Sequence, residues 1–279
     1  MQLKQALQRA IEDLTSHDVG SPRLNAETLL MFTLGCDRAY LYAHPERKLT
    51  AEEDERYSQI VSERASGKPS QYIIGHQEFW GLDFLVSPAV LIPRPETEHL
   101  IEVALELAAA RKSSPRIVDV GTGSGCIALT LAHELPQAEV HGTEISNEAL
   151  DIARINRERL DLGRVKLHRC DLLEGLDAEG QFDLIISNPP YVSEAEPEKV
   201  QRQVRDFEPK VAVFAGPTGL EIYRRLIPQA WDFLRTEGWL LMEIGFSIEA
   251  QVRELLKGWP EISTRNDLQG IPRVVAAKK

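Results

Sequence analysis

The chain has 279 residues, of which 43% are hydrophobic and 27% are charged. This is the balance of a folded globular protein and excludes a disordered or fibrous one. The length exceeds one average domain, so we expect one α/β domain preceded by a smaller unit. The net charge of -11 opposes binding to a phosphate backbone, so nucleic acid is not the expected partner.

The first part of the chain shows helical patterns only. Apolar residues recur on one helix face over residues 3–14, and Ser21-Pro22 precedes a second helical segment. A third helix is expected to open after Thr50, with acids in its first turn, and to end at Gly67. We therefore predict an N-terminal helical domain over residues 1–75.

The next segment shows strand and turn patterns in place of helical ones. The sequence EFWGLDFLV places two short apolar runs around Trp80-Gly81, which predicts a β-hairpin. Pro93 and Pro95 then exclude a regular helix in LIPRPETEHL until Glu96. Residues 76–96 are thus predicted to form a hairpin and linker between two domains.

Strand and helix patterns alternate over the rest of the chain. Apolar strands are expected in IVDV, AEVHGTEI, VKLH, FDLIIS and WLLMEI, with helical patterns between them. This alternation predicts a mostly parallel sheet with helices on both faces, over residues 97–279. Neither a membrane-spanning run nor a secretory segment is visible, so a cytoplasmic location without membrane contact is expected. The three cysteines have no metal-site or disulfide spacing, so no metal is expected.

A glycine loop follows the first strand of the sheet. Gly121, Gly123 and Gly125 lie between IVDV and an apolar helix, at the strand end where open α/β sheets bind ligands. Cys126 stands where a dinucleotide fingerprint needs its third glycine, and the Gly-Lys-Ser/Thr of a P-loop is absent. Phosphate binding is therefore disfavoured, and a plain tight turn is the alternative to a ligand site.

Two acidic residues end the next two strands. Glu144 is placed to accept hydrogen bonds from the ribose hydroxyls of an adenosine, as in NAD and S-adenosylmethionine sites. Asp171 is a candidate acceptor for the adenine amino group, or equally a cap for the following turn. Leu172 would provide an apolar wall for adenine. Taken singly, either acid could be an ordinary solvated carboxylate.

The strand FDLIIS ends in Asn188-Pro189-Pro190-Tyr191, the most specific motif of the chain. The Asn188 side-chain oxygen and the Pro189 carbonyl can each accept one N–H of a planar NH2 group and stabilise the charge that develops on its nitrogen. Two prolines stiffen the loop, and Tyr191 can pack on the flat acceptor. No general base is assigned, because the proton can leave after the nitrogen has reacted. A rigid structural loop is the alternative.

Together these segments resemble the release factor glutamine methyltransferases, the PrmC or HemK family. LIPRPETE, DVGTGSG, NPPY, VRDFEPKVAVFAGPTGLEIYRRLI and MEIGFSIEAQV occur in that order and cover nearly the whole chain. The resemblance implies a seven-stranded Rossmann-like class I methyltransferase domain, a helical domain that helps to dock the release factor, and methylation of the glutamine in a Gly-Gly-Gln loop. It assigns residues 188–191 to the glutamine, with Asn188 touching both ligands. The S-adenosylmethionine residues that it implies are Gly121, Thr122, Gly123, Ser124, Gly125 and Glu144. Where Leu172 stands, other members carry an aromatic residue.

Two other functions stay open. An adenine-N6 DNA methyltransferase would hold the exocyclic amine of a flipped base with the same tetrapeptide, although the acidic composition counts against DNA. A catalytically silent adaptor is the second, against which the intact motifs argue. Arg94, Glu96 and Glu208 are candidates for ordering the acceptor pocket or for surface ion pairs and caps. A monomer is expected, because the enzyme must accept a large protein and no coiled-coil seam is visible.

Overall fold

A computed structural model describes residues 1–111, 113–177, 181–195 and 197–279. These residues divide into two compact units, one of residues 1–76 and 202–207 and the other of residues 77–201 and 208–279. The helices of the first unit are α1 (Leu3–Ser16), α2 (Pro22–Leu34), α3 (Arg38–Ala43), α4 (Ala51–Ala65), α5 (Ser70–Ile74) and α9 (Arg202–Phe207).

The helical unit has its own apolar core. Leu3, Leu14, Leu29 and Tyr57 are among its fully buried side chains. Helix α4 begins after Thr50, as predicted, because the Thr50 hydroxyl accepts the N–H of a glutamate three residues on and that glutamate accepts the Thr50 N–H.

Helix α9 belongs to the helical unit although it comes from the second half of the chain. The sequence predicts a helical domain of residues 1–75 alone, without this helix. Arg64 donates to the side-chain oxygen of Gln203 at 3.0 Å. The Phe207 ring lies only 3.3 Å from the point that a Cβ on Gly67 would occupy. Gly67 therefore leaves room for this ring, a packing relation that local sequence patterns do not reveal.

The strands of the described residues lie in the second unit, except that the first strand residue, His76, is counted with the first unit. They are β1 (His76–Phe79), β2 (Leu82–Leu85), β3 (Arg116–Val120), β4 (Glu139–Glu144), β5 (Lys166–Arg169), β6 (Phe182–Ser187), β7 (Leu234–Glu243), β8 (Glu261–Asn266) and β9 (Pro272–Lys278). β1 and β2 form the predicted hairpin, with φ of 54° at Trp80 and 72° at Gly81. The other seven form one sheet in the order β5-β4-β3-β6-β7-β9-β8, in which β9 pairs antiparallel with β7 and β8 and the remaining pairs are parallel. The predicted seven-stranded, mostly parallel sheet is confirmed.

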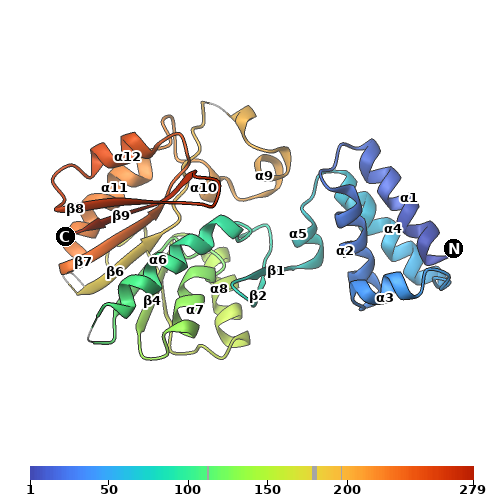
Figure 1. Cartoon of the computed structure of the whole chain (residues 1–279), viewed down its shortest axis with the longest axis horizontal. Coiled ribbons are helices and arrows are strands. Elements are labelled where there is room, and N and C mark those ends of the chain that lie inside the picture. Colours follow the sequence, from blue (N-terminus) through green and yellow to red (C-terminus); the bar gives the residue numbers. More distant parts are fainter. Residues whose placement is uncertain (112, 178–180, 196) are drawn as a thin grey trace. The chain divides into compact units, whose positions relative to one another are not determined.

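Helices cover both faces of this sheet (Figure 1). The helices of the second unit are α6 (Glu98–Ala109), α7 (Cys126–Glu134), α8 (Asn147–Arg159), α10 (Lys210–Val213), α11 (Glu221–Phe233) and α12 (Glu249–Leu255), and the unit also holds the short 3-10 turns η1 (Pro95–Thr97) and η2 (Pro197–Lys199). Because side chains alternate along a strand, Ile117 packs with α6 and α7 on one face, while Val118 and Val120 pack with α11 and α12 on the other. Burial on both faces holds the strand ends in place.

A buried amide ties the hairpin and the glycine loop to α8. The Asn156 side chain is fully buried, accepts the N–H of Leu85 at 2.8 Å, and donates to the carbonyls of Leu85 and Ser124 at 2.9 Å each. Both segments therefore keep their backbone groups paired away from water. Within the described residues, no helix combines the length and the apolar character that crossing a membrane requires.

Replacing Asn156 by alanine should lower the free energy of unfolding by about 2–3 kcal/mol, because three backbone groups, two of Leu85 and one of Ser124, lose the partner that this fully buried side chain provides. Urea denaturation would measure it. The matched control is Asn147→Ala at the exposed start of α8, expected to stay within about 0.5 kcal/mol of the wild type. Equal effects of the two substitutions would contradict the role given to Asn156.

Candidate functional site

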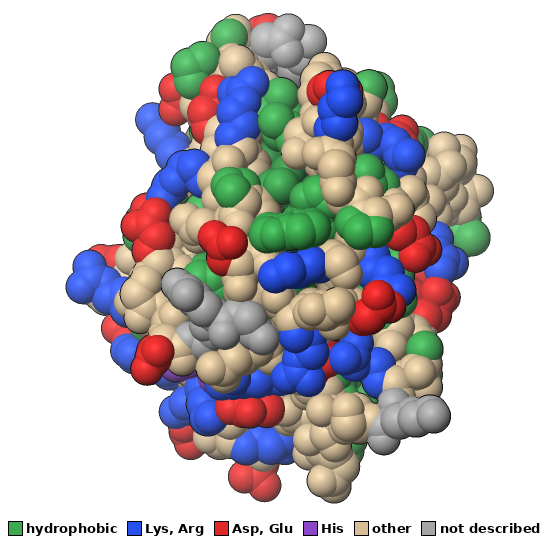
Figure 2. All heavy atoms as spheres, turned by 90° about the vertical axis from the view of Figure 1, so that its left-hand side faces the viewer, with side chains coloured by type: hydrophobic (Ala, Val, Ile, Leu, Met, Phe, Trp, Pro, Cys, Tyr) green, Lys and Arg blue, Asp and Glu red, His purple; other side chains and the backbone are tan. Residues whose placement is uncertain are grey.

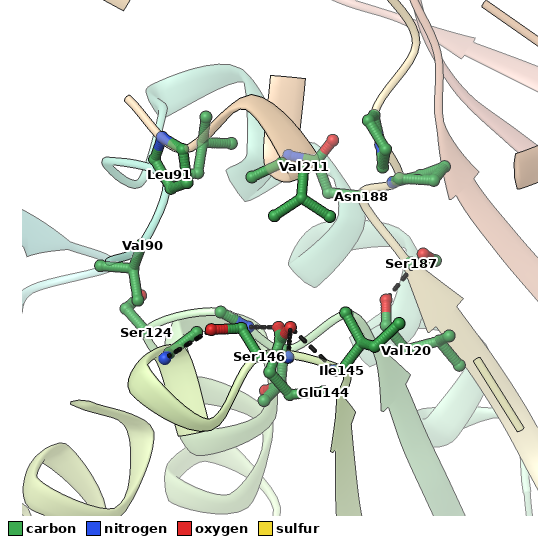
Figure 3. Close-up of a pocket in the computed structure, with 18 of the residues that line it drawn as sticks. Val90, Leu91, Val120, Ser124, Glu144, Ile145, Ser146, Ser187, Asn188 and Val211 are labelled. Atoms are coloured by element: carbon green, nitrogen blue, oxygen red, sulfur yellow. Dashed lines mark hydrogen bonds between the residues drawn. The ribbon is translucent and has the colours of Figure 1, made fainter. Parts of the chain in front are cut away.

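The carboxyl ends of β3, β4 and β6 border a cavity of about 240 Å³. Figure 3 shows Asn188 and Val211 on one side of it and Glu144 and Ile145 across from them. The structure thus brings together residues that the sequence predicted at separate strand ends. The predicted site residues that line the cavity are Gly121, Thr122, Gly123, Ser124, Glu144, Asp171, Leu172, Asn188, Pro189 and Pro190.

The three predicted glycines have different surroundings. Gly121 and Gly123 have φ of 75° and 55°, and a Cβ on either would meet no atom within 4 Å. They leave open space where a ligand can approach the backbone. Gly125 does not line the cavity, because it packs against α7, where an added Cβ would lie 2.9 Å from Leu129. Its position indicates a packing role.

Glu144 closes the end of β4 beneath the glycine loop. One of its carboxylate oxygens accepts the backbone N–H of Gly123 at 3.0 Å. The other accepts the N–H groups of Ile145 and Ser146 at 2.9 and 3.0 Å. A carboxylate offers about four acceptor positions, so Glu144 retains capacity toward the cavity while it fixes the loop.

Asp171 lies on the cavity wall and is paired with a cation. Its carboxylate accepts from the Arg225 guanidinium at 2.7 Å, and Arg225 also lines the cavity. Leu172 beside it has a φ of 53°, which is unusual for a residue with a branched side chain. The predicted adenine wall is therefore apolar at Leu172 and carries an ion pair at Asp171.

The Asn-Pro-Pro-Tyr loop is fixed from several sides. The Ser187 hydroxyl donates to the carbonyl of Val120 at 2.7 Å, which joins the ends of β6 and β3. Tyr191 does not line the cavity. Its ring lies over Gly245, where a Cβ would come within 2.9 Å of it, and its carbonyl lies 2.5 Å from the Cβ position of Gly219. Burial raises the pKa of Tyr191 to about 12. Two glycines far along the chain thus make room for Tyr191.

Asn188 also makes a contact that the sequence did not predict. Its side-chain nitrogen donates to the Thr97 hydroxyl at 3.1 Å, and that hydroxyl donates to the Glu243 carboxylate at 2.7 Å. Thr97 and Glu243 are 2% and 4% exposed. Burial raises the pKa of Glu243 to about 7. The one feature of the sequence that hints at this contact is the acidic residue at the end of the apolar strand WLLME.

Arg94 and Glu208 form an ion pair beside the cavity. The side chain of Glu208 is fully buried and also accepts the N–H of Ile92 at 3.2 Å. Burial raises the pKa of the Glu208 carboxyl, although the Arg94 guanidinium opposes the shift. Glu96 lies 3.9 Å from Arg273. The sequence leaves the roles of Arg94, Glu96 and Glu208 undecided. Their contacts indicate that Arg94 and Glu208 help to order the wall of the cavity.

Two family descriptions match the chain, the PrmC N-terminal domain over residues 5–75 and the Methyltransferase small domain over residues 98–206. The release factor glutamine methyltransferase of Koribacter versatilis is 56% identical over 279 residues, covering 100% of this chain and 99% of that protein. The release factor glutamine methyltransferase of Nitratidesulfovibrio vulgaris is 41% identical and covers 99% and 95% of the two chains.

Solved structures share the fold at low sequence identity. The catalytic domain of hMettl16 in complex with MAT2A 3'UTR hairpin 1 has a TM-score of 0.59 at 20% identity, covering 78% of this chain and 79% of that one. The N-terminal domain of human METTL16 in complex with SAH has a TM-score of 0.51 at 20% identity, covering 71% and 76%. These likenesses concern the fold.

Asp119, near the end of β3, is hydrogen-bonded to the glycine loop, and its protonation provides a test of this geometry. It is fully buried, and one carboxylate oxygen accepts the Thr122 hydroxyl at 2.6 Å and the Ala128 N–H at 3.2 Å. Burial raises its pKa to about 7. The folded state therefore holds a proton that the unfolded chain releases near pH 4, so wild-type stability falls as pH rises from about 4 to about 7.

Asp119→Asn keeps an acceptor but cannot ionise. Its stability relative to the wild type should therefore rise by about 1–3 kcal/mol between pH 5 and pH 8, as measured by urea unfolding. Asp232→Asn, at an exposed position of α11, is the matched control and should show no such trend. A difference at Asp119 that is constant with pH would rule out the buried, protonated carboxyl.

Proposed function

Since this chain belongs to the release factor glutamine methyltransferase family, we propose that it methylates the side-chain amide nitrogen (N5) of the glutamine in the Gly-Gly-Gln motif of peptide chain release factors, using S-adenosyl-L-methionine. The observation that carries the proposal is 56% identity over essentially the full length of a relative with this name. The cavity between the glycine loop and the Asn-Pro-Pro-Tyr loop supplies the matching chemistry.

The cavity has the features that S-adenosylmethionine needs. The open space beside Gly121 and Gly123 admits a ligand against the backbone, and Glu144, which accepts three backbone N–H groups, keeps acceptor capacity for a ribose hydroxyl. Leu172 offers an apolar surface for adenine, and Asp171 an acceptor for its amino group. When bound, S-adenosylmethionine supplies a methyl group attached to a positively charged sulfur, and this sulfur is a good leaving group because it becomes a neutral sulfide.

The acceptor nitrogen of glutamine is a weak nucleophile, because its lone pair is delocalised into the carbonyl. We assign its two N–H groups to the Asn188 side-chain oxygen and the Pro189 carbonyl, which turn one face of the nitrogen toward the methyl group. The same acceptors stabilise positive charge as the nitrogen loses conjugation. Pro190 stiffens the loop. The sequence predicts that Tyr191 packs on the acceptor, but its ring lies over Gly245 outside the cavity, so we assign it to holding the loop in place. We assign no general base.

The helical unit is proposed to help dock the release factor, and the sheet unit to carry the reaction, with residues 76–96 joining them. We propose that the protein acts as a cytoplasmic monomer and that nucleic acid is not its substrate. The net charge of -11 supports this exclusion, and Figure 2 shows Lys and Arg side chains among Asp and Glu on one face. Adenine-N6 methylation of DNA is the competing function, and the names of the relatives do not favour it.

The function is tested by incubating the protein with labelled S-adenosylmethionine and either purified unmethylated release factor or duplex DNA. Mass spectrometry should find one added methyl group, on the glutamine of the Gly-Gly-Gln peptide, and no label in the DNA. Label in adenine together with an unmodified release factor would establish the rival function instead.

Replacement of Asn188 by alanine removes one acceptor of the amide N–H groups. We expect kcat for the release factor to fall about 100- to 1,000-fold, as when a preorganised oxyanion-hole donor is lost. Asn147→Ala, on the exposed start of α8, is the control and should keep wild-type turnover. A folded Asn188→Ala protein with near-normal turnover would refute the assigned role.

A further inference from the structure

A buried hydrogen-bond chain runs from the Asn-Pro-Pro-Tyr loop to the end of β7. Asn188 donates through its side-chain nitrogen to Thr97, and Thr97 donates to Glu243, at 3.1 and 2.7 Å. The three residues come from the loop after β6, the end of η1 and the end of β7. Thr97 also lines the cavity.

The direction of this chain determines the orientation of the Asn188 amide. A threonine hydroxyl has one hydrogen, and Thr97 gives it to the Glu243 carboxylate, which in its ionised form only accepts. The Thr97 oxygen can then only accept from Asn188. Asn188 must turn its NH2 group to Thr97, and its carbonyl oxygen remains for the cavity.

We propose that Thr97 and Glu243 are positioning residues that hold the Asn188 side chain with its oxygen toward the acceptor nitrogen. The inference rests on the proposed function, in which that oxygen accepts an N–H of the glutamine. With the amide reversed, Asn188 would present N–H to N–H and lose this interaction. Thr97 and Glu243 therefore act on the reaction through Asn188.

The protonation of Glu243 gives this arrangement a pH dependence. Burial raises the pKa of Glu243 to about 7. A protonated Glu243 donates to Thr97, which frees the Thr97 hydrogen for the Asn188 oxygen and favours the reversed amide. Activity should thus fall as pH decreases through about 7. The other ionisable or charged groups around Glu243 are Arg94, Glu96, Cys126, Tyr191, Tyr223 and Arg273.

The first test compares initial rates of release factor methylation by the full-length wild type, Thr97→Val and Thr97→Ser at pH 8. Thr97→Val, similar in shape but without the hydroxyl, should lower kcat about 10- to 100-fold, with the KM for S-adenosylmethionine within about threefold. Thr97→Ser should restore kcat to within about fivefold of the wild type. An active wild type with an unaffected Thr97→Val variant would overturn the inference, whereas an inactive wild type would instead refute the proposed function.

The second test asks whether Thr97 acts through Asn188. In an Asn188→Ala background, Thr97→Val should change kcat by no more than about twofold, because the side chain that it orients is gone. The same loss in both backgrounds would overturn the positioning role and indicate a general structural effect.

A third test is independent of substitution at Thr97. The wild-type kcat should fall as the pH decreases through about 7, and Glu243→Gln should lack this limb because it cannot titrate there. A wild-type profile without the limb, or a limb that persists in Glu243→Gln, would overturn the assignment of Glu243. This comparison decides the matter even if Thr97→Val fails to fold.

Discussion

The carboxyl ends of β3, β4, β6 and β7 meet at one edge of a sheet that is buried on both faces, and the site depends on this convergence. β3 leads into the glycine loop, β4 ends at Glu144, β6 is followed by Asn188, and β7 ends at Glu243. Apolar side chains on both faces fix the strands, so polar groups at their ends are held without flexible supports. A loose sheet could not keep an amide acceptor aimed at one nitrogen.

The chemistry explains why so much of the structure surrounds one asparagine. A glutamine amide becomes a nucleophile only while its nitrogen is held away from full conjugation, so the acceptors must be oriented before the substrate arrives. Ser187 ties the loop to β3, Gly219 and Gly245 leave room for Tyr191, and Thr97 pairs with the Asn188 nitrogen. These contacts together limit the orientations that Asn188 can adopt.

The sequence predicts the architecture and the strand-end residues well, because both depend on local patterns. Buried apolar runs mark the strands; Gly121 and Asn188 directly follow a strand, and Glu144 is the last residue of one. The contacts of Thr97 with Glu243, 146 residues apart, follow from packing and could not be predicted. The same holds for α9 joining the helical unit, and for Gly125, whose place against Leu129 distinguishes it from Gly121 and Gly123. Spacing alone does not show which glycine faces a ligand.

The central claim is that Asn188 and Pro189 together hold the glutamine nitrogen. A crystal structure of the protein with S-adenosylhomocysteine and an unmethylated release factor would test it most directly. The account predicts that the glutamine side-chain nitrogen lies about 2.7–3.2 Å from both the Asn188 side-chain oxygen and the Pro189 carbonyl, with the Asn188 nitrogen still on Thr97. A glutamine whose oxygen faces Asn188, or whose nitrogen contacts neither residue, would contradict it.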